Sequence, residues 1–370
     1  MSNSAADRAA MAAALALGRR GLGRVWPNPA VGCVILDDAG AVAGRGWTQP
    51  GGRPHAETEA LKRAGERARG ATAFVTLEPC NHHGLTPPCT EALITAGVAR
   101  AVVAIGDPDE RVDGGGFHRL RSAGIAVDVG LCAEDARYDQ PGFLTRILHG
   151  RPMFALKAAT SLDGRIAAAG GDSKWITGPA ARRAGHLLRA EHDAILVGIG
   201  TALADDPRLD CRLPGIEAAS LLRILLDSRL RLPPTHDLAA AAGVRPTWLF
   251  AAEDADAGRR SALEALGVKV IPTPLAKDGL DVVAIARMLG AAGLTRVLVE
   301  GGGAVAAALL KADLIDRIHA YRAPVAIGGD GVPALGSLGL VRVADAPRFE
   351  LRNTSRVGAD VADLYVRKRT

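Results

Sequence analysis

The sequence predicts an α/β protein built from two domains. Its 370 residues exceed the length at which a single hydrophobic core stops growing, so two cores are expected. Short apolar runs rich in β-branched residues alternate with longer alanine-rich runs, as strands alternate with helices in α/β folds. The alternation breaks at His149-Gly150-Arg151-Pro152, where we place the domain boundary.

In the first half, the pattern predicts helices and strands of ordinary length. Residues 5–20 are rich in alanine and predict a helix. Residues 30–42 are apolar on both sides of Asp37-Asp38-Ala39-Gly40, a turn sequence that predicts a hairpin. Pro54 marks the first turn of a helix over residues 55–68. Strands are also expected at residues 73–77, 100–105 and 125–129, with a helix over residues 88–96.

The second half continues the same alternation, which favours a mostly parallel sheet with an antiparallel edge. Its strands are expected at residues 153–159, 194–197, 222–226, 247–251, 269–271, 296–299, 317–322 and 361–368. The two predicted domains are therefore residues 1–148 and 152–370.

Composition and charge limit the classes of function. Apolar residues make up 48% of the chain, which allows sizeable cores and argues against disorder. Aromatic residues are only 4%, too few for base-stacking platforms. The net charge of +5 is spread along the chain without a dense Lys/Arg run. We therefore expect a phosphorylated small-molecule substrate rather than nucleic acid as the partner.

Cysteine usage and hydropathy predict a soluble cytoplasmic protein. Five cysteines in so long a chain do not make a disulfide framework, and they indicate a reducing compartment. No stretch approaches the roughly 18 uninterrupted apolar residues that a membrane span needs, so no membrane association is expected.

Three residues predict a catalytic metal site. His55 and Glu57 belong to one short motif, and Cys80 and Cys89 bracket a loop of eight residues. One imidazole and two thiolates leave the fourth position of a tetrahedral zinc ion open for water, as a catalytic site requires. The spacing H-x-E followed by P-C is typical of zinc-dependent base deaminases. We expect one Zn²⁺, held by His55, Cys80 and Cys89.

The chemistry of such a site assigns a role to Glu57. Residues i and i+2 of a regular helix point about 200° apart, so His55 and Glu57 share a cavity only in a first turn. A zinc ion with three protein ligands lowers the pKa of its water to about 7. An unligated Glu57 would take the proton from that water and pass it to the leaving amine. A closed structural site, with His82 or His83 as fourth ligand, and a metal-free coincidence are the alternatives.

Several longer segments are distinctive. In the first half they are Trp26-Pro-Asn-Pro-Ala-Val-Gly32, Pro54-His-Ala-Glu57, Thr76-Leu-Glu-Pro-Cys80, His82-His-Gly84 and Thr86-Pro-Pro-Cys89. In the second half they are Leu156-Lys-Ala-Ala-Thr-Ser-Leu-Asp-Gly164, Ser173-Lys-Trp-Ile-Thr177, Thr201-Ala-Leu-Ala-Asp-Asp-Pro207 and Val299-Glu-Gly-Gly302. Together these segments resemble one family, the bifunctional deaminase-reductases of riboflavin biosynthesis, and the resemblance covers nearly the whole chain.

The resemblance implies a fold for each half and two consecutive reactions. The N-terminal half would be a cytidine-deaminase-like three-layer αβα domain, and the C-terminal half a dihydrofolate-reductase-like α/β domain. The first would deaminate 2,5-diamino-6-(5-phosphoribosylamino)pyrimidin-4(3H)-one, using zinc. The second would use NADPH to reduce the ribosyl group of 5-amino-6-(5-phosphoribosylamino)uracil to ribityl. A homodimer formed through the reductase domain is also implied.

The resemblance further implies contacts for each ligand. Asn28 looks like a substrate-pocket residue, because its amide can pair with a pyrimidine edge, although an ordinary turn asparagine is the alternative. The NADPH contacts would be Ala159, Trp175, Thr201, Asp205, Ser228, Gly302, Gly303, Ala304, Val305, Ala306, Ala307 and Ala308. The further substrate contacts would be Ser173, Arg189, Leu209, Arg212 and Glu300.

Physical reasoning supports part of this assignment. The run from Gly301 to Gly303 joins a strand to a helix, where backbone N–H groups can approach a pyrophosphate, although an unliganded tight turn is the alternative. Arg189 and Arg212 suit phosphate, and surface ion pairs are the alternative. Lys157 could face the ribose or simply pair with an acid such as Asp163. Ser228 and Arg229 follow a strand and could meet the adenosine 2′-phosphate.

The sequence also departs from the family pattern near the metal. Thr48 stands where the family commonly has histidine, Leu85 where a basic residue usually precedes Thr-Pro-Pro-Cys, and Asn81 where serine is common. These changes leave the metal ligands intact and raise the question of how the pocket holds a ribose phosphate.

Two other functions were weighed against the bifunctional enzyme. One is a zinc-dependent nucleoside or tRNA deaminase with an unrelated C-terminal domain, against which the long Cys80–Cys89 loop and the second-half segments argue. The other is a non-catalytic zinc-stabilised binding module, which would have no use for Glu57.

Overall fold

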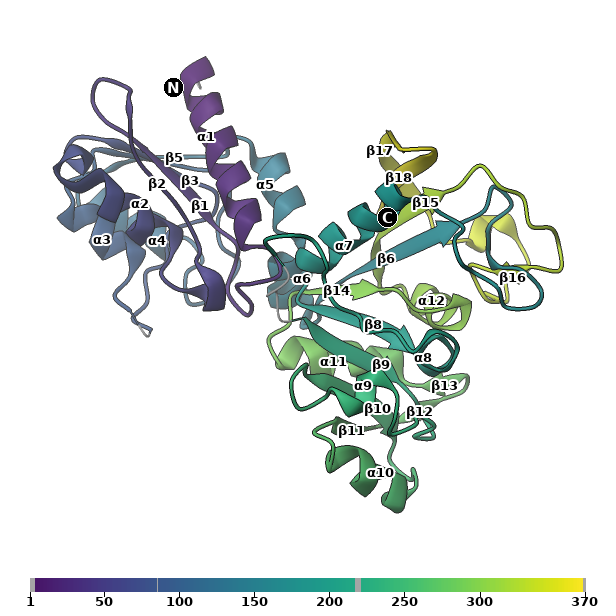
Figure 1. The fold of residues 1–370 in the computed structure, drawn as a ribbon. Helices are drawn as coiled ribbons and strands as arrows, with labels where there is room; N and C mark the ends of the chain where they lie inside the picture. The colour runs from purple at the N-terminus through teal and green to yellow at the C-terminus, as the bar shows by residue number, and fades with distance from the viewer. Residues whose placement is uncertain (1–3, 85, 217–220, 369–370) are drawn as a thin grey trace. The chain divides into compact units, whose positions relative to one another are not determined.

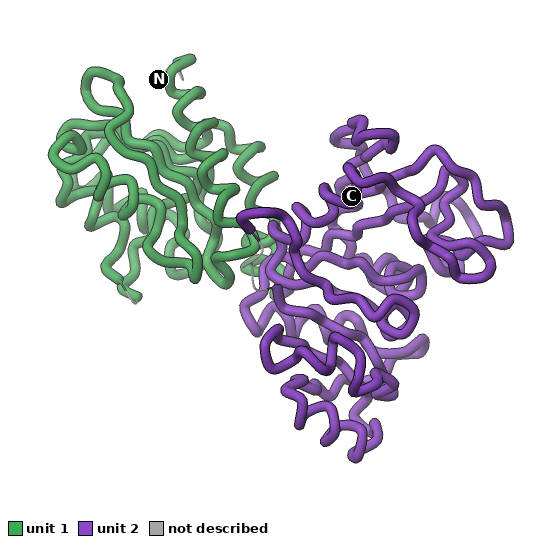
Figure 2. The backbone as a smooth tube through the Cα atoms, in the orientation of Figure 1, with its two compact units in different colours: residues 1–150 green, residues 151–370 purple. Residues whose placement is uncertain are grey.

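The chain divides into two compact units, residues 1–150 and 151–370 (Figure 2). The computed structural model describes residues 4–84, 86–216 and 221–368, so Leu85 lies outside the described residues.

The first unit is built on one five-stranded sheet in the order β2-β1-β3-β4-β5 (Figure 1). Strand β1 pairs antiparallel with β2 and β3, whereas β3, β4 and β5 run parallel. The strands are β1 Gly32–Leu36, β2 Val42–Trp47, β3 Thr72–Val75, β4 Arg100–Val103 and β5 Ala126–Val129. The predicted hairpin is confirmed as β1–β2, and an Asp37 carboxylate oxygen accepts the Ala41 N–H at its turn.

Helices cover both faces of this sheet. A Cβ added to Gly32 would overlap the Ala14 carbonyl of α1, and one added to Gly46 would overlap the Ala56 carbonyl of α2. Gly46 pairs with Cys33, the residue after Gly32, and successive strand residues face opposite ways, so α1 and α2 lie on opposite faces. The helices are α1 Ala5–Gly18, α2 Ala56–Ala64, α3 Cys89–Thr95, α4 Gly115–Ser122, α5 Ala133–Asp139 and α6 Pro141–His149, with short 3₁₀ turns η1 Arg19–Gly21, η2 Pro50–Gly52 and η3 Gly65–Ala68.

The predicted three-layer αβα arrangement is therefore confirmed. Helix α3 packs beside α2 and α4 beside α3, while α5 packs beside α1. Met11, Phe74, Leu93 and Leu120 are fully buried between the layers.

The second unit contains a nine-stranded sheet in the order β11-β10-β9-β8-β14-β6-β15-β18-β17 (Figure 1). Neighbouring strands from β11 to β15 run parallel, and β18 and β17 add an antiparallel edge, as the alternation predicts. The strands are β6 Met153–Thr160, β8 Ala194–Gly198, β9 Leu222–Leu226, β10 Thr247–Ala252, β11 Lys269–Thr273, β14 Arg296–Val299, β15 Ile315–Arg322, β17 Phe349–Val357 and β18 Asp360–Arg367.

Helices and two small sheets complete the second unit. The helices are α7 Pro179–Ala190, α8 Ile199–Asp205, α9 Asp237–Ala240, α10 Ala257–Glu264, α11 Val282–Ala291 and α12 Gly303–Lys311, with a 3₁₀ turn η4 Val343–Asp345. The two-stranded sheets pair β12 Leu275–Ala276 with β13 Gly279–Leu280, and β7 Arg165–Ala167 with β16 Val332–Pro333. Within the described part of the chain, no helix is long and apolar enough to cross a membrane.

Sequence analysis did not predict β17, the edge strand next to β18. Its residues are mostly exposed on both faces, so they lack the apolar alternation that identifies a half-buried strand. The strand is nonetheless held by pairing with β18 along most of its length. The short strands β7, β12, β13 and β16 were missed as well, because two or three residues carry no measurable period.

The close contact between β2 and α2 makes Gly46 a sensitive position. We expect Gly46→Ala to push α2 away from the sheet, because the new methyl group would overlap the Ala56 carbonyl directly after His55. The free energy of unfolding should fall by about 1–3 kcal/mol, the usual cost of overpacking, and zinc content should fall with it. Thermal unfolding and metal analysis measure both changes.

Gly115→Ala is the matched control for Gly46→Ala. A Cβ there would lie 3.7 Å from the Asn81 side chain, an ordinary contact. Equal stability of the two variants would contradict the packing argument.

Candidate functional site

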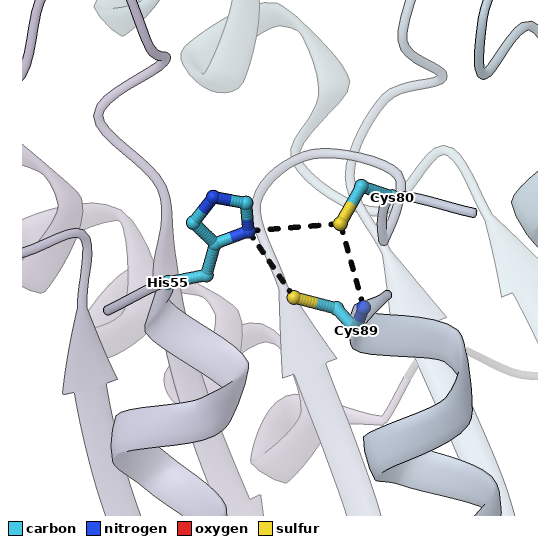
Figure 3. Close-up of side chains that lie close together, drawn as sticks. All are labelled: His55, Cys80 and Cys89. Carbon is cyan, nitrogen blue, oxygen red and sulfur yellow. Dashed lines mark hydrogen bonds between the residues drawn. The ribbon is translucent and has the colours of Figure 1, made fainter. Parts of the chain in front are cut away.

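His55, Cys80 and Cys89 lie together in the first unit (Figure 3). His55 is the N-cap of α2, Cys80 follows β3, and Cys89 is the first residue of α3. The His55 Nδ1 atom lies 3.3 Å from the Cys89 Sγ and 3.6 Å from the Cys80 Sγ. One ligand atom from each residue thus falls within 4.8 Å of the others, close enough for one metal ion.

The polar surroundings favour the thiolate of Cys80, one of the two sulfur ligands that a metal needs. The Cys89 backbone N–H donates to the Cys80 Sγ at 3.4 Å, and this amide belongs to the first turn of α3. The Cys89 thiol also donates toward Cys80, which together with His55 lowers the pKa of Cys80 to about 4. Sharing that proton with Cys80, together with burial, raises the pKa of Cys89. Zinc binding takes both residues as thiolates.

The donor set fits a catalytic zinc ion. One nitrogen and two sulfur ligands match the borderline-soft preference of Zn²⁺ and leave one position open. Among the described residues, the cluster contains no fourth His, Cys, Asp or Glu. His83 lies instead 3.4 Å from the Glu91 carboxylate, on the exposed side of α3. The arrangement therefore supports the open catalytic site and not the closed structural one.

Glu57 lines the same cavity as two of the three predicted ligands, His55 and Cys80. It lies in the first turn of α2, one residue beyond Ala56, and is 3% exposed. Burial raises the pKa of its carboxyl to about 7, which is the range in which a carboxylate can both accept and return a proton. The cavity of about 280 Å³ is lined by Glu57, His55 and Cys80.

Asn28 and Thr48 also line this cavity. The Asn28 Nδ2 donates to the Gly52 carbonyl at 3.1 Å, so one end of its amide is fixed by the loop that precedes His55. Thr48 is buried, and its hydroxyl accepts the Val31 N–H at 3.0 Å. Thr48 therefore stabilises the start of β1.

A buried carboxylate that the sequence reasoning did not single out organises the far wall of the cavity. The Glu78 carboxylate accepts backbone N–H groups from Asp107 at 3.3 Å, Gly114 at 3.2 Å and Phe117 at 3.1 Å. These three contacts fix the loop between β4 and α4, which carries Asp107 and Asp109 into the cavity. The sequence does contain a signal for this role, because Glu78 lies only two residues before the predicted zinc ligand Cys80.

A second cavity, of about 300 Å³, lies at the carboxyl ends of β6, β8 and β14 in the second unit. Most of the contacts proposed for NADPH and substrate line it: Ala159, Ser173, Trp175, Arg189, Thr201, Asp205, Leu209, Glu300 and Gly302. Ligands of α/β sheets bind in this position, outside the carboxyl ends of parallel strands.

Arg189 and Glu300 form a buried ion pair in the wall of this second cavity. The Arg189 Nε and Nη2 donate to the two Glu300 carboxylate oxygens at 2.7 and 2.8 Å, and Nη1 donates to the Asp210 carbonyl at 2.8 Å. Burial alone would raise the pKa of Glu300, but the charges of Arg189 and Lys157 lower it to about 2. Lys157 lines the same cavity, and burial lowers the pKa of its amine.

The other eight predicted contacts lie outside this cavity lining: Arg212, Ser228 and the six residues from Gly303 to Ala308. The Arg212 side chain is exposed and lies 3.4 Å from the Asp210 carboxylate. Ser228 lines a separate cavity at the ends of β9 and β10, together with Arg229 and Lys277. In the run from Gly302 to Ala308, Gly302 is the N-cap of α12, and its N–H donates to the Thr201 hydroxyl. Ala306 and Ala307 of the same run are buried in the packing face of α12.

Comparison with known proteins identifies the family. Residues 4–105 match the cytidine and deoxycytidylate deaminase zinc-binding region, and residues 152–362 match the RibD C-terminal domain. The riboflavin biosynthesis protein RibD of Escherichia coli K12 is 44% identical over 366 residues, covering 96% of this chain and 98% of that protein. The chain belongs to the RibD family.

Solved RibD structures have the same two-unit architecture. RibD from Acinetobacter baumannii superposes with a TM-score of 0.87 at 37% identity, covering 98% of this chain and 99% of that one. A diaminohydroxyphosphoribosylaminopyrimidine deaminase/5-amino-6-(5-phosphoribosylamino)uracil reductase from Thermotoga maritima has a TM-score of 0.84 at 33% identity, covering 98% of each chain.

The family assignment confirms the predicted fold classes and the predicted kind of protein. This chain is a bifunctional enzyme of riboflavin biosynthesis, with a zinc-dependent deaminase and an NADPH-dependent reductase. The hypotheses of an unrelated C-terminal half and of a non-catalytic binding module are therefore wrong.

The Glu78 contacts generate a prediction about the deaminase. Glu78→Gln should lower its kcat/KM roughly tenfold, because one carboxylate oxygen becomes an amide that cannot accept the backbone N–H groups. Zinc content should stay near one ion per chain, since Glu78 does not belong to the ligand cluster. An ammonia-release assay and metal analysis measure the two quantities.

Glu110→Gln, on the same loop but exposed, is the control and should retain full activity. Loss of zinc together with loss of activity in Glu78→Gln would show that Glu78 stabilises the fold of the whole unit rather than the cavity wall alone.

Proposed function

We propose that this chain deaminates 2,5-diamino-6-(5-phosphoribosylamino)pyrimidin-4(3H)-one and then reduces 5-amino-6-(5-phosphoribosylamino)uracil at its ribosyl group with NADPH. The observation that carries the proposal is the buried Glu57, which lines one cavity together with His55 and Cys80 of the His55–Cys80–Cys89 cluster. The Thermotoga maritima protein, named for these two substrates, aligns over 98% of the chain.

Deamination is assigned to the predicted domain of residues 1–148, which belongs to the first unit. His55, Cys80 and Cys89 would hold a zinc ion, which when bound supplies a water molecule with a pKa of about 7. The Glu57 carboxylate takes up a proton as oxygen attacks the amino-bearing carbon of the pyrimidine. It then returns a proton to the departing nitrogen, and ammonia leaves. Asn28 orients the pyrimidine with the part of its amide that does not contact Gly52.

Reduction is assigned to the predicted domain of residues 152–370, which belongs to the second unit. Trp175, Thr201, Asp205 and the N-terminus of α12 would place the nicotinamide and pyrophosphate of NADPH in the second cavity. Hydride from NADPH forms a C–H bond at the anomeric carbon of the ribosyl group. The bond from this carbon to the ring oxygen breaks, and the ring oxygen gains a proton. Ser173, Leu209 and the Arg189–Glu300 pair form the wall against which the ribose lies.

The adenosine end of NADPH belongs, in this proposal, to the separate cavity beside β9 and β10. Strands β8 and β9 are neighbours in the sheet and end at the same edge, so a dinucleotide can extend from one cavity toward the other. Ser228, Arg229 and Lys277 there offer a hydroxyl and two cations to the 2′-phosphate.

The remaining expectations concern partners and location. We propose a phosphorylated small molecule as the only substrate class, with no nucleic acid, and a cytoplasmic location. A homodimer through the second unit is supported by β17, whose outer edge is unpaired among the described strands. Val341, Val343 and Leu351 lie exposed in and before that strand, and an edge strand with apolar neighbours suits pairing with a second copy.

Independence of the two sites is testable with Glu57→Gln. The amide cannot take up the proton, so ammonia release should fall at least a thousandfold, in line with loss of general acid–base catalysis. NADPH oxidation with supplied 5-amino-6-(5-phosphoribosylamino)uracil should be unchanged. Both steps are measured on the same folded, zinc-loaded preparation, and loss of both activities would contradict the assignment of one reaction to each unit.

Cofactor preference is testable at Arg229. Arg229→Ala should raise the KM for NADPH roughly tenfold and leave the KM for NADH unchanged, because only NADPH carries the 2′-phosphate. Steady-state kinetics with both cofactors give the ratio. Arg231→Ala, on an exposed arginine two residues away, is the control, and an unchanged NADPH/NADH ratio in Arg229→Ala would remove the role.

A further inference from the structure

The loop before the zinc ligand His55 carries a cation whose charge no carboxylate neutralises. The Arg53 guanidinium lines the deaminase cavity, and its Nη1 donates to the neutral Thr86 hydroxyl. Among the residues that the structure describes, no carboxylate lies within ion-pair distance of Arg53. A guanidinium in this situation keeps its attraction for an anion.

Arg111, another of the arginines that line the cavity, differs in this respect. The Arg111 Nε and Nη2 donate to the two Asp109 oxygens at 2.9 and 2.6 Å, so a neighbouring carboxylate already neutralises it. Asp107 and Glu78 lie on that same wall. A dianionic phosphate would meet three carboxylates there, whereas at Arg53 it meets an unpaired cation.

The backbone holds Arg53 in a fixed place. The Gly52 carbonyl before it accepts the Asn28 amide at 3.1 Å, and the Pro54 carbonyl after it accepts the Gln49 N–H at 3.0 Å. A Cβ at Gly84 would lie 3.1 Å from the Arg53 Nη2, so the guanidinium lies along the loop between the two cysteines. Asn28, the residue proposed to contact the pyrimidine, is thus hydrogen-bonded to the same short segment that carries Arg53.

We propose that Arg53 is the residue of the deaminase cavity that binds the 5-phosphate of the substrate. The inference rests on the proposed function for the identity of the substrate. It answers the question that Leu85 raises, because the positive charge that this chain lacks at position 85 is supplied by Arg53, which contacts the next residue, Thr86.

The test compares phosphorylated and dephosphorylated forms of the diaminopyrimidine in ammonia-release kinetics. In Arg53→Gln the KM for the phosphorylated form should rise about ten- to hundredfold, as expected for loss of a charge-assisted hydrogen bond. The KM for the dephosphorylated form should change less than about twofold. Arg53→Lys, which keeps the charge, should recover part of the difference. Arg63→Gln, on an exposed arginine of α2 that pairs with Glu59, should behave like the unmodified enzyme.

Two outcomes would overturn the proposal. An equal rise in KM for both forms would show that Arg53 contacts the pyrimidine or stabilises the loop. Unchanged KM values for both forms would show that the phosphate binds elsewhere. Zinc content and thermal unfolding of Arg53→Gln should match those of the unmodified chain.

A binding measurement separates failure of this inference from failure of the proposed function. Ribose 5-phosphate is titrated calorimetrically into the zinc-loaded full chain and into Arg53→Gln, with ribose as the reference ligand. The reductase cavity is the same in both proteins, so the difference reports the deaminase cavity alone. A weaker phosphate-dependent signal in Arg53→Gln supports the inference even if the diaminopyrimidine is not deaminated, and identical titrations overturn it.

Discussion

The deaminase site depends on two helices that begin at one point. Helix α2 begins directly after His55 and α3 begins at Cys89, so the positive ends of both helices face the position where zinc would bind. This geometry favours the Cys80 thiolate, and it places Glu57 in the first turn, where a side chain two residues from His55 can still reach the same cavity. The contact of Gly46 with α2 sets the distance between that helix and the sheet, and hence the position of His55.

The reductase unit depends on a different interaction, the buried pair of Arg189 and Glu300. Arg189 comes from α7 and Glu300 from the end of β14, so the pair joins a helix to the centre of the sheet beside the cavity. Removing one partner of such a pair leaves an uncompensated buried charge, which is costly. Lys157 adds a second positive charge near Glu300, so this carboxylate stays ionised in a low-dielectric wall.

Sequence reasoning located the parts of the protein that depend on local spacing. The zinc ligands, Glu57, the β1–β2 hairpin and the parallel order of the second sheet all follow from short motifs and periodicity. The sequence alone does not show that Arg189 donates its hydrogen bonds to Glu300, that Thr48 stabilises the start of β1, or that Glu78 fixes the loop before α4. Each of these depends on residues 17 to 111 positions apart in the chain. Ser228 and Arg212 show the same limit, because a strand end or a charged residue does not reveal which cavity it faces.

Arginine content in the sequence is therefore a poor guide to where phosphate binds. The net charge of +5 counts Arg111 and Arg189 as fully as Arg53, yet Asp109 neutralises the first and Glu300 the second. A paired guanidinium still donates hydrogen bonds, but its partner repels an incoming anion at nearly the same distance. What attracts phosphate is a cation without a carboxylate beside it, held by its backbone on the wall of a cavity. In the first unit, the loop that ends at His55 meets both conditions, so one segment supplies a metal ligand and an arginine of the cavity wall.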